Sequence, residues 1–172
     1  MHRSGREFYD CCGSMGILNK VSVAIATLGP IGYLPAPGTW GTLCAVPILY
    51  ALRSFYDLSA VLIIVAAFTL LAFAAVHYAL PSFGGHDDPS HIVIDEFIGF
   101  AALACAIPLK PVLFGAGFLL FRFFDIIKPL GIKRVERLHG VFGIMCDDLV
   151  AAFYAGLCVQ SFVYSLHYLN LY

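Results

Sequence analysis

A run of 23 residues, Leu58 to Leu80, most strongly limits what this chain can fold into. His77 is its only strongly polar side chain. Because about 20 apolar residues in a helix cross the hydrocarbon core of a bilayer, the run predicts a transmembrane helix. The final segment, Leu149 to Tyr172, is also apolar and long enough to span.

The composition agrees with a membrane protein. Of 172 residues, 60% are hydrophobic and 12% are charged, whereas soluble domains have about 45–50% apolar and about 25% charged residues. The length predicts one domain. A net charge of −1 argues against a nucleic-acid partner.

We expect residues 1–20 to be a flexible N-terminal extension and residues 21–172 to form a single helical domain. Charged residues interrupt the extension, so it does not resemble a signal peptide. No strand-like alternation of useful length occurs, and the predicted fold is an all-α, compact multi-helix bundle. The predicted helices cover residues 43–52, 58–80, 88–107, 112 to about 128, and 149–172, with a short helix and turn over 21–34.

The stretch from His86 to Cys105 joins acidic residues to an otherwise apolar helix. Asp88 before Pro89 is typical of a helix start. In that helix Asp95 would lie seven residues on, on the face of Asp88, with Glu96 about 100° away. Since an unpaired buried charge costs several kcal/mol, a lysine, an arginine or a metal ion must lie nearby.

Two later segments carry further charges. Arg122, Asp125 and Lys128 follow one another at spacings of three, which fits either a functional stripe or a local ladder of ion pairs. Asp147 and Asp148 are expected to open the last helix. Between them, residues 131–143 form a basic loop.

Pro35 to Leu43, P-A-P-G-T-W-G-T-L, is rich in proline and glycine and predicts a loop, with Thr39 as the N-cap of the next helix. Such a loop before a helix N-terminus suits a phosphate group. An ordinary turn and cap is the alternative.

The predicted connections bring residues 31–41, 81–96 and 122–148 to one side of the membrane. Basic residues on that side indicate the cytoplasm. The arms around residues 97–124 are short, at roughly 17–24 Å against a core of ~30 Å, so the bundle is either integral or anchored in the interface. Clustered carboxylates suit Mg²⁺, Mn²⁺ or Ca²⁺. Metal and phosphate together suggest phosphoryl chemistry on a lipid or isoprenoid phosphate.

Three segments resemble the bacterial phosphatidylglycerophosphatase A family. They are L-P-A-P-G-T-W-G-T-L at 34–43, D-P-S-H-I-V-I-D-E-F-I-G at 88–99, and F-R-F-F-D-I-I-K-P at 121–129 followed by G-I-M-C-D-D at 143–148. The resemblance covers roughly residues 25–160. It implies an Mg²⁺-dependent lipid phosphatase of the cytoplasmic (inner) membrane that hydrolyses phosphatidylglycerophosphate to phosphatidylglycerol and phosphate.

The resemblance also implies the site. The expected catalytic residues are Asp95, Glu96, Asp125, Asp147 and Asp148. The expected metal ligands are Asp88, Asp95, Glu96, Asp147 and Asp148. The expected substrate-binding residues are Gly38, Thr39, Gly41, Thr42, Arg122 and Lys128. Asp147 and Asp148 are expected to divide their roles, one on the metal and the other as a base or behind the first ligands. Asp125 is expected either to bind metal or to orient Lys128.

Two rival functions stay open at this point. An ion-coupled transporter would spread its acids through the membrane depth. A phosphatidyltransferase also uses Mg²⁺ and aspartates, but its D-G-x₂-A-R pattern is absent from the sequence. The attacking nucleophile, the number of metal ions and the oligomeric state are undetermined by the sequence.

Overall fold

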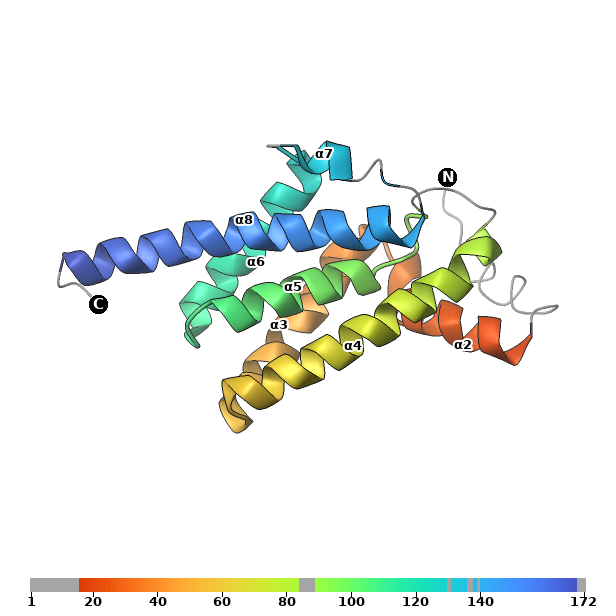
Figure 1. Cartoon of the computed structure of the whole chain (residues 1–172), viewed down its shortest axis with the longest axis horizontal. Helices are drawn as coiled ribbons and strands as arrows, with labels where there is room; N and C mark the ends of the chain where they lie inside the picture. Colours follow the sequence, from red (N-terminus) through yellow and green to blue (C-terminus); the bar gives the residue numbers. More distant parts are fainter. Residues whose placement is uncertain (1–15, 84–88, 130, 136–137, 139, 170–172) are drawn as a thin grey trace.

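The computed structural model describes residues 16–83, 89–129, 131–135, 138 and 140–169. The described residues form helices and contain no β-strand, which confirms the predicted all-α class (Figure 1). In chain order the elements are α2 (Ile17–Ala26), the 3-10 turn η1 (Ile31–Tyr33), α3 (Pro37–Phe55), α4 (Leu58–Ala79), the 3-10 turn η2 (Leu80–Phe83), α5 (Ile94–Ala106), α6 (Pro111–Ile127), α7 (Ile132–Val135) and α8 (Val141–Tyr168).

α5 is the central helix of the bundle. It lies between α4 and α8 in Figure 1, and it also packs against α3. Nine of its 13 residues are buried. Phe100 packs edge-on against Phe114 and Phe121 of α6, with ring centroids 6.1 and 6.4 Å apart. A largely apolar helix is stable in this central position because neighbouring helices cover most of its surface.

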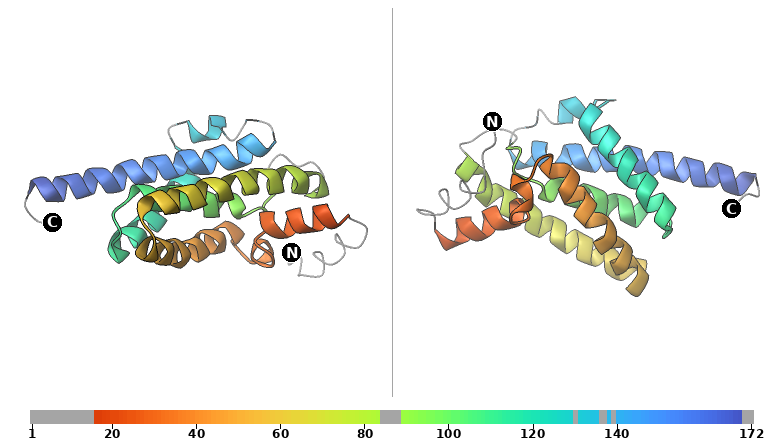
Figure 2. Two further views of the ribbon diagram at one scale, coloured as in Figure 1. Left: turned by 60° about the horizontal axis from the view of Figure 1, so that its bottom comes forward. Right: turned by 180° about the vertical axis from the view of Figure 1, so that it is seen from behind.

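In the described part of the chain, two stretches are long and apolar enough to cross a membrane: Leu58–Phe83, with a mean hydropathy of 2.7, and α8, with 1.6. Only 22% and 28% of these windows are buried. Figure 2 shows the C-terminal part of α8 extending beyond the other helices. Such large exposed apolar surfaces require a partner or a bilayer, so the two helices agree with the predicted membrane protein. The 13 residues of α5 and the 17 of α6 make shorter arms, as expected.

The prediction that residues 35–43 form a loop capped by Thr39 is wrong. α3 begins at Pro37, and Ala36 in the left-handed conformation precedes it. Proline is favourable at the first helical position because no amide hydrogen bond is lost there. Gly41 lets the first turns of α3 lie close to the chain before α5, since a Cβ on it would be 3.0 Å from the Val93 carbonyl oxygen.

The prediction that a helix starts at Asp88 is also wrong, because α5 begins at Ile94 and Val93 is its N-cap. The preceding residues form a turn in which the Ile92 amide bonds the Pro89 carbonyl at 2.9 Å. The Val93 amide then donates to the Ala26 carbonyl of α2 at 3.0 Å. Asp88 itself lies outside the described residues.

The starts of two other helices differ from the sequence prediction. α8 begins at Val141, so Asp147 and Asp148 lie in its second turn and do not open it. α2 begins at Ile17, inside the segment expected to be an extension, and residues 1–15 lie outside the described residues. The basic loop after α6 contains the short helix α7.

Candidate active site

Polar side chains of α3, α5, α6 and α8 line one cavity of about 300 Å³. Five of the six acidic residues in the described part of the chain line it: Asp95, Glu96, Asp125, Asp147 and Asp148. The sixth, Asp57, caps the N-terminus of α4. This arrangement confirms the convergence of the three polar segments, and it does not favour the transporter reading, which requires acids along the membrane depth.

Three carboxylates meet on one side of the cavity. Asp95, Glu96 and Asp148 each offer one oxygen, and these oxygens lie within 4.8 Å of one another. Asp95 and Glu96 stand in the first turn of α5. One turn later Gly99 lets α8 approach, because a Cβ on it would be 3.1 Å from the Cβ of Asp148. We call Asp95, Glu96 and Asp148 the carboxylate cluster.

Burial changes the acidity of the α5 members of the carboxylate cluster. Asp95 is 8% exposed, and its burial raises the pKa of the carboxyl well above the usual value, with further increases from Glu96 and Asp148. Burial also raises the pKa of Glu96, although its hydrogen bond with Asp95 and the charge of Arg122 act in the opposite direction. Without a cation, these carboxylates are therefore costly to ionise together.

Two oxygens of the carboxylate cluster have no hydrogen-bond partner among the described residues. Glu96 Oε2 and Asp148 Oδ1 are buried, and within the described part of the chain neither has a hydrogen-bond partner. A buried polar atom without a partner costs about 1–3 kcal/mol, and more when charged. The orphaned oxygens thus fit a cation bound between the three carboxylates.

Arg122 lies beside the carboxylate cluster and is held by its neighbours. Its Nη1 is 2.8 Å from Asp125 Oδ2 and 3.9 Å from Glu96 Oε1. The same nitrogen donates to Thr42 Oγ1 at 3.4 Å. Thr42 in turn donates to the Gly38 carbonyl at 2.9 Å. These contacts fix the guanidinium at the cavity wall.

Lys128 ends α6, in the left-handed conformation that stops the helix before Pro129. Its Nζ lies 2.7 Å from Asp147 Oδ2. Asp147 and Asp148 point about 100° apart because they are adjacent on a helix. Asp148 therefore joins the carboxylate cluster while Asp147 contacts Lys128. Asp147 lies outside the three-carboxylate group.

The glycine and threonine residues of α3 divide into two groups. Gly38 and Thr39 line the cavity at the first turn of the helix, whereas Gly41 and Thr42 are buried behind it. A Cβ on Gly38 would overlap Glu96 Oε1. The close packing of Gly38 is thus one reason for glycine in this motif.

Part of the cavity wall was not predicted from the sequence. Its further lining residues are Ala36, Pro37, Ser90, Ile92, Ile126 and Ile144. Next to Ser90, the His91 ring stacks on Tyr33 with centroids 4.9 Å apart, and its Nδ1 lies 2.9 Å from the Gly32 carbonyl oxygen. All six lie within the motif segments at 34–43, 88–99, 121–129 and 143–148, and this position in a motif was the available signal.

The chain is similar to proteins of one known family. The family model described as Phosphatidylglycerophosphatase A matches residues 24–163. Phosphatidylglycerophosphatase A of Haemophilus influenzae is 38% identical over 152 residues, covering 87% of this chain and 93% of the relative. The protein of that name from Escherichia coli is 38% identical over 117 residues, covering 67% of each chain.

A third relative carries another name. A Bacteroides thetaiotaomicron protein named "Putative phosphatidylinositol-3-phosphatase" is 38% identical over 144 residues, covering 80% of this chain and 90% of its own. No solved structure matches the chain. The family match covers the whole cavity, from the start of α3 to the acids of α8. This chain belongs to the phosphatidylglycerophosphatase A family.

Proposed function

We propose that this protein removes the terminal phosphate of phosphatidylglycerophosphate and releases phosphatidylglycerol and inorganic phosphate. The observation that carries the proposal is the carboxylate cluster, which shares one cavity with Arg122 and Lys128 in a chain of this family. Carboxylates that bind a metal and cations that bind phosphate are the parts that phosphomonoester hydrolysis needs.

The proposed cofactor is Mg²⁺, held by Asp95, Glu96 and Asp148. An all-oxygen donor set suits this ion, which usually binds through a few carboxylates, waters and substrate phosphate. The orphaned oxygens of Glu96 and Asp148 support a cation at this position. When bound, Mg²⁺ would neutralise phosphate charge and lower the pKa of a coordinated water. Asp88, the remaining expected ligand, lies outside the described residues.

The proposed phosphate-binding groups are Arg122, Lys128 and the first turn of α3, where Gly38 and Thr39 face the cavity. A helix N-terminus favours an anion through its free amides and dipole. Asp125 positions the Arg122 side chain through a contact of 2.8 Å, and Asp147 positions the Lys128 side chain through one of 2.7 Å. Asp147 is also placed to hold or accept a proton near the substrate. Gly41 and Thr42 support the wall from behind.

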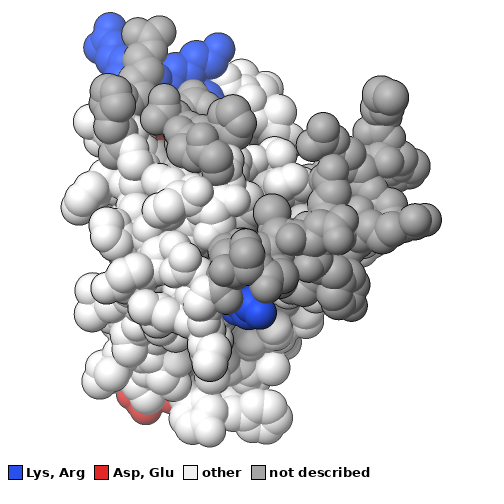
Figure 3. Space-filling model, turned by 90° about the vertical axis from the view of Figure 1, so that its right-hand side faces the viewer, with Lys and Arg blue, Asp and Glu red and all other residues white. Residues whose placement is uncertain are grey.

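We also propose that the cavity opens toward the cytoplasmic side of the inner membrane. Lys133 and Arg134 of α7 are exposed, and basic segments next to a membrane favour the cytoplasm. Figure 3 shows the end of the molecule at the right of Figure 1, where Lys and Arg side chains lie at the upper edge and at one further place below the centre. Most of the remaining described surface in this view is uncharged.

A second candidate substrate is phosphatidylinositol 3-phosphate. The Bacteroides relative named for it is as similar to this chain as the phosphatidylglycerophosphatases are. Both lipids present a phosphomonoester on a polar headgroup, so the same carboxylates and the same basic side chains, Arg122 and Lys128, could bind either phosphate. The difference lies in how the rest of the headgroup fits the cavity wall.

The test measures phosphate release from both lipids by the purified protein in detergent, with Mg²⁺ and then with excess EDTA. We expect release from phosphatidylglycerophosphate that requires Mg²⁺, and at least tenfold slower release from phosphatidylinositol 3-phosphate. Faster phosphate release from phosphatidylinositol 3-phosphate would make that lipid the preferred substrate in place of phosphatidylglycerophosphate. Release that EDTA leaves unchanged would refute the metal proposal, and no release from either lipid would refute the function.

A further inference from the structure

Gly99 of α5 lies where side chains of α6 and α8 meet α5 beside the carboxylate cluster. A Cβ on Gly99 would be 2.8 Å from Phe121 Cζ and 3.1 Å from the Cβ of Asp148. Phe121 is fully buried, and its ring packs against Phe100 with centroids 6.4 Å apart. The Cβ of Asp148 is bonded directly to the α8 backbone. A methyl group at position 99 therefore moves α6, α8 or both away from α5.

The carboxylates of the cluster stand on both sides of this contact. On α5, Gly99 follows Asp95 by four residues and Glu96 by three. It thus lies one turn after them and between their directions on the helix surface. On α8, the Cβ nearest to position 99 belongs to Asp148 itself. The separation of α5 and α8 at Gly99 therefore determines how far the Asp148 carboxylate stands from the other two.

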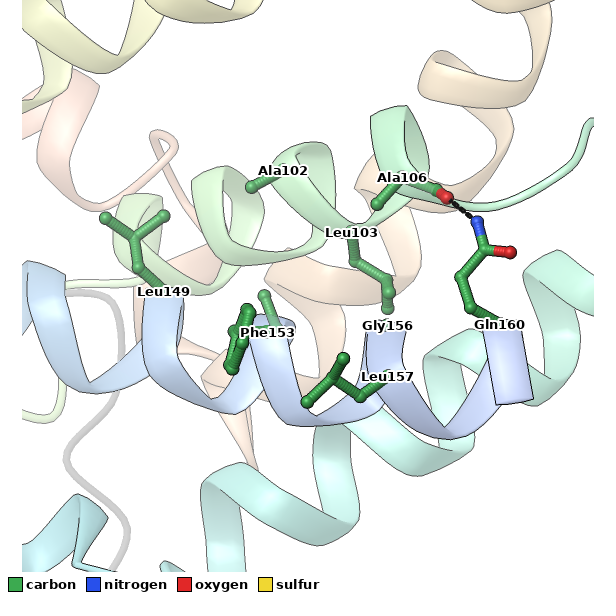
Figure 4. Close-up of a pocket in the computed structure, with 9 residues that line it drawn as sticks. Ala102, Leu103, Ala106, Leu149, Phe153, Gly156, Leu157 and Gln160 are labelled. Carbon is green, nitrogen blue, oxygen red and sulfur yellow. Dashed lines mark hydrogen bonds between the residues drawn. The ribbon is translucent and has the colours of Figure 1, made fainter. Parts of the chain in front are cut away.

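The same two helices are packed less tightly farther from the cluster. Between them lies a cavity of about 400 Å³, lined by small side chains such as Ala106 and Gly156. Figure 4 shows Gly156 of α8 opposite Leu103 of α5. A Cβ on Gly156 would be 3.5 Å from Leu103 Cδ1, which is an ordinary van der Waals distance. The close contact at Gly99 is therefore local to the cluster and not a property of the whole helix pair.

The spacing of the three carboxylates affects which divalent ion fits between them. Mg²⁺ binds oxygens at about 2.0–2.1 Å and demands near-octahedral geometry, whereas Ca²⁺ binds them at about 2.3–2.6 Å in more flexible arrangements. The two ions thus differ by roughly 0.3–0.5 Å in metal–oxygen distance. A contact as close as that between position 99 and Asp148 is relieved by a movement of a few tenths of an ångström. The movement and the difference between the ions have the same size.

We propose that Gly99 is a positioning residue that holds the Asp148 carboxylate close enough to the two α5 carboxylates for Mg²⁺ to be selected against Ca²⁺. This inference rests on the metal part of the proposed function, and it assigns ion selectivity to a residue that binds neither metal nor substrate. The buried oxygens of Glu96 and Asp148 that have no hydrogen-bond partner in the described part of the chain support a cation at this place.

The test measures metal binding by the purified protein in detergent, without substrate. The wild-type protein and Gly99→Ala are freed of metal with EDTA, the chelator is removed, and Mg²⁺ or Ca²⁺ is added in isothermal titration calorimetry. In Gly99→Ala we expect the Kd for Mg²⁺ to rise about tenfold and the Kd for Ca²⁺ to change by less than about threefold, because the larger ion accepts the wider spacing.

Two other buried glycines provide matched controls. Gly156→Ala adds the same methyl group to the same helix pair at an ordinary distance from Leu103, so both Kd values should stay at the wild-type level. Gly117→Ala places the methyl group 3.2 Å from Ile107 Cδ1, away from the cluster. It should lower the melting temperature without changing the ratio of the two Kd values. An equal change of this ratio in Gly117→Ala would overturn the proposal.

A second variant keeps the test decisive if Gly99→Ala is too unstable to purify. Combining Gly99→Ala with Phe121→Leu removes the ring atoms nearest to the new methyl group and leaves its contact with Asp148 in place. We expect the same change in the ratio of the two Kd values. Circular dichroism reports whether the helical fold is kept.

The outcomes separate this inference from the proposed function. If the wild-type protein binds metal and the Gly99 variants keep its ratio of Kd values, the inference is overturned and the phosphatase proposal stands. Equal weakening of both ions also overturns the inference. A changed ratio in a protein that hydrolyses neither lipid supports the inference and refutes the phosphatase proposal. If the wild-type protein binds neither ion, the inference and the metal proposal are both overturned.

Discussion

The two ends of α5 differ in whether their polar oxygens accept hydrogen bonds from other helices. At the C-terminal end the carbonyls receive donors from other helices: Arg53 Nη1 donates to Ala104 and to Ile107, the latter at 2.6 Å, and Gln160 donates to Ala106. At the N-terminal end, Glu96 Oε2 has no such donor within the described residues. Residues distant in the sequence can thus provide hydrogen-bond donors to the end of a buried helix. The orphaned oxygens at the other end thus mark a place for a ligand.

The largest effect is expected from Asp148→Asn, which removes the α8 carboxylate that faces the N-terminal end of α5. The amide is a poor metal ligand, so we expect phosphatase activity to fall by about 10³-fold or more. The melting temperature without metal should stay the same or rise, because one of three crowded carboxylates is neutralised. Asp57→Asn is the control, since Asp57 caps α4 outside the cavity and asparagine is an equally good cap. Full turnover by Asp148→Asn would contradict the assignment.

The next largest effect is expected from Arg53→Met, a change in α3 at the C-terminal end of α5. This change removes the charged donor of two carbonyls, and we expect the free energy of unfolding to fall by about 2–4 kcal/mol. Equilibrium unfolding in detergent measures it. Arg53→Lys, which keeps the charge, should lose less. Activity per folded molecule should be retained in both, and a selective loss of activity would mean that this end also serves the site.

A smaller effect is expected from Gly38→Ala, which tests how tightly the N-terminal end is packed. The added Cβ overlaps Glu96 Oε1, so the carboxylate must move, and we expect activity to fall about 10–100-fold. Gly115→Ala is the matched control, because this exposed glycine of α6 has no atom within 4 Å of the added Cβ. Equal activities of the two variants would show that the position of Glu96 is unimportant.

The smallest effect concerns pH. Because the folded-state pKa values of Asp95 and Glu96 are raised, the native state binds protons more tightly than the unfolded chain. Their stabilisation is fully present below the unfolded pKa of about 4 and is lost as the pH rises through the folded pKa. In EDTA we expect a melting temperature a few degrees lower at pH 7.5 than at pH 5. Asp95→Asn should flatten this dependence, and a rise with pH would contradict it.

Much of the fold could be predicted from the sequence. The apolar run at 58–80 is a helix because its length and composition allow little else in a bilayer, and α4 covers it almost completely. The first residues of α3 and α5 could not be predicted in the same way. Asp88-Pro89 is a strong local signal for a helix start. However, the Val93 amide donates a hydrogen bond to the Ala26 carbonyl of α2. This tertiary contact holds the chain outside a helix until α5 begins at Ile94.

By itself the sequence determined the all-α class, the membrane-like composition and the set of charged residues, because these depend on residue type and local period. It also indicated that three distant motifs converge. Only the tertiary structure decided which acids meet. Asp147 and Asp148 are chemically identical and adjacent, but the close approach of α8 at Gly99 directs Asp148 to Asp95 and Glu96, while Asp147 contacts Lys128. The physical reason is that a helix turns its neighbours about 100° apart, and only packing determines what each one faces.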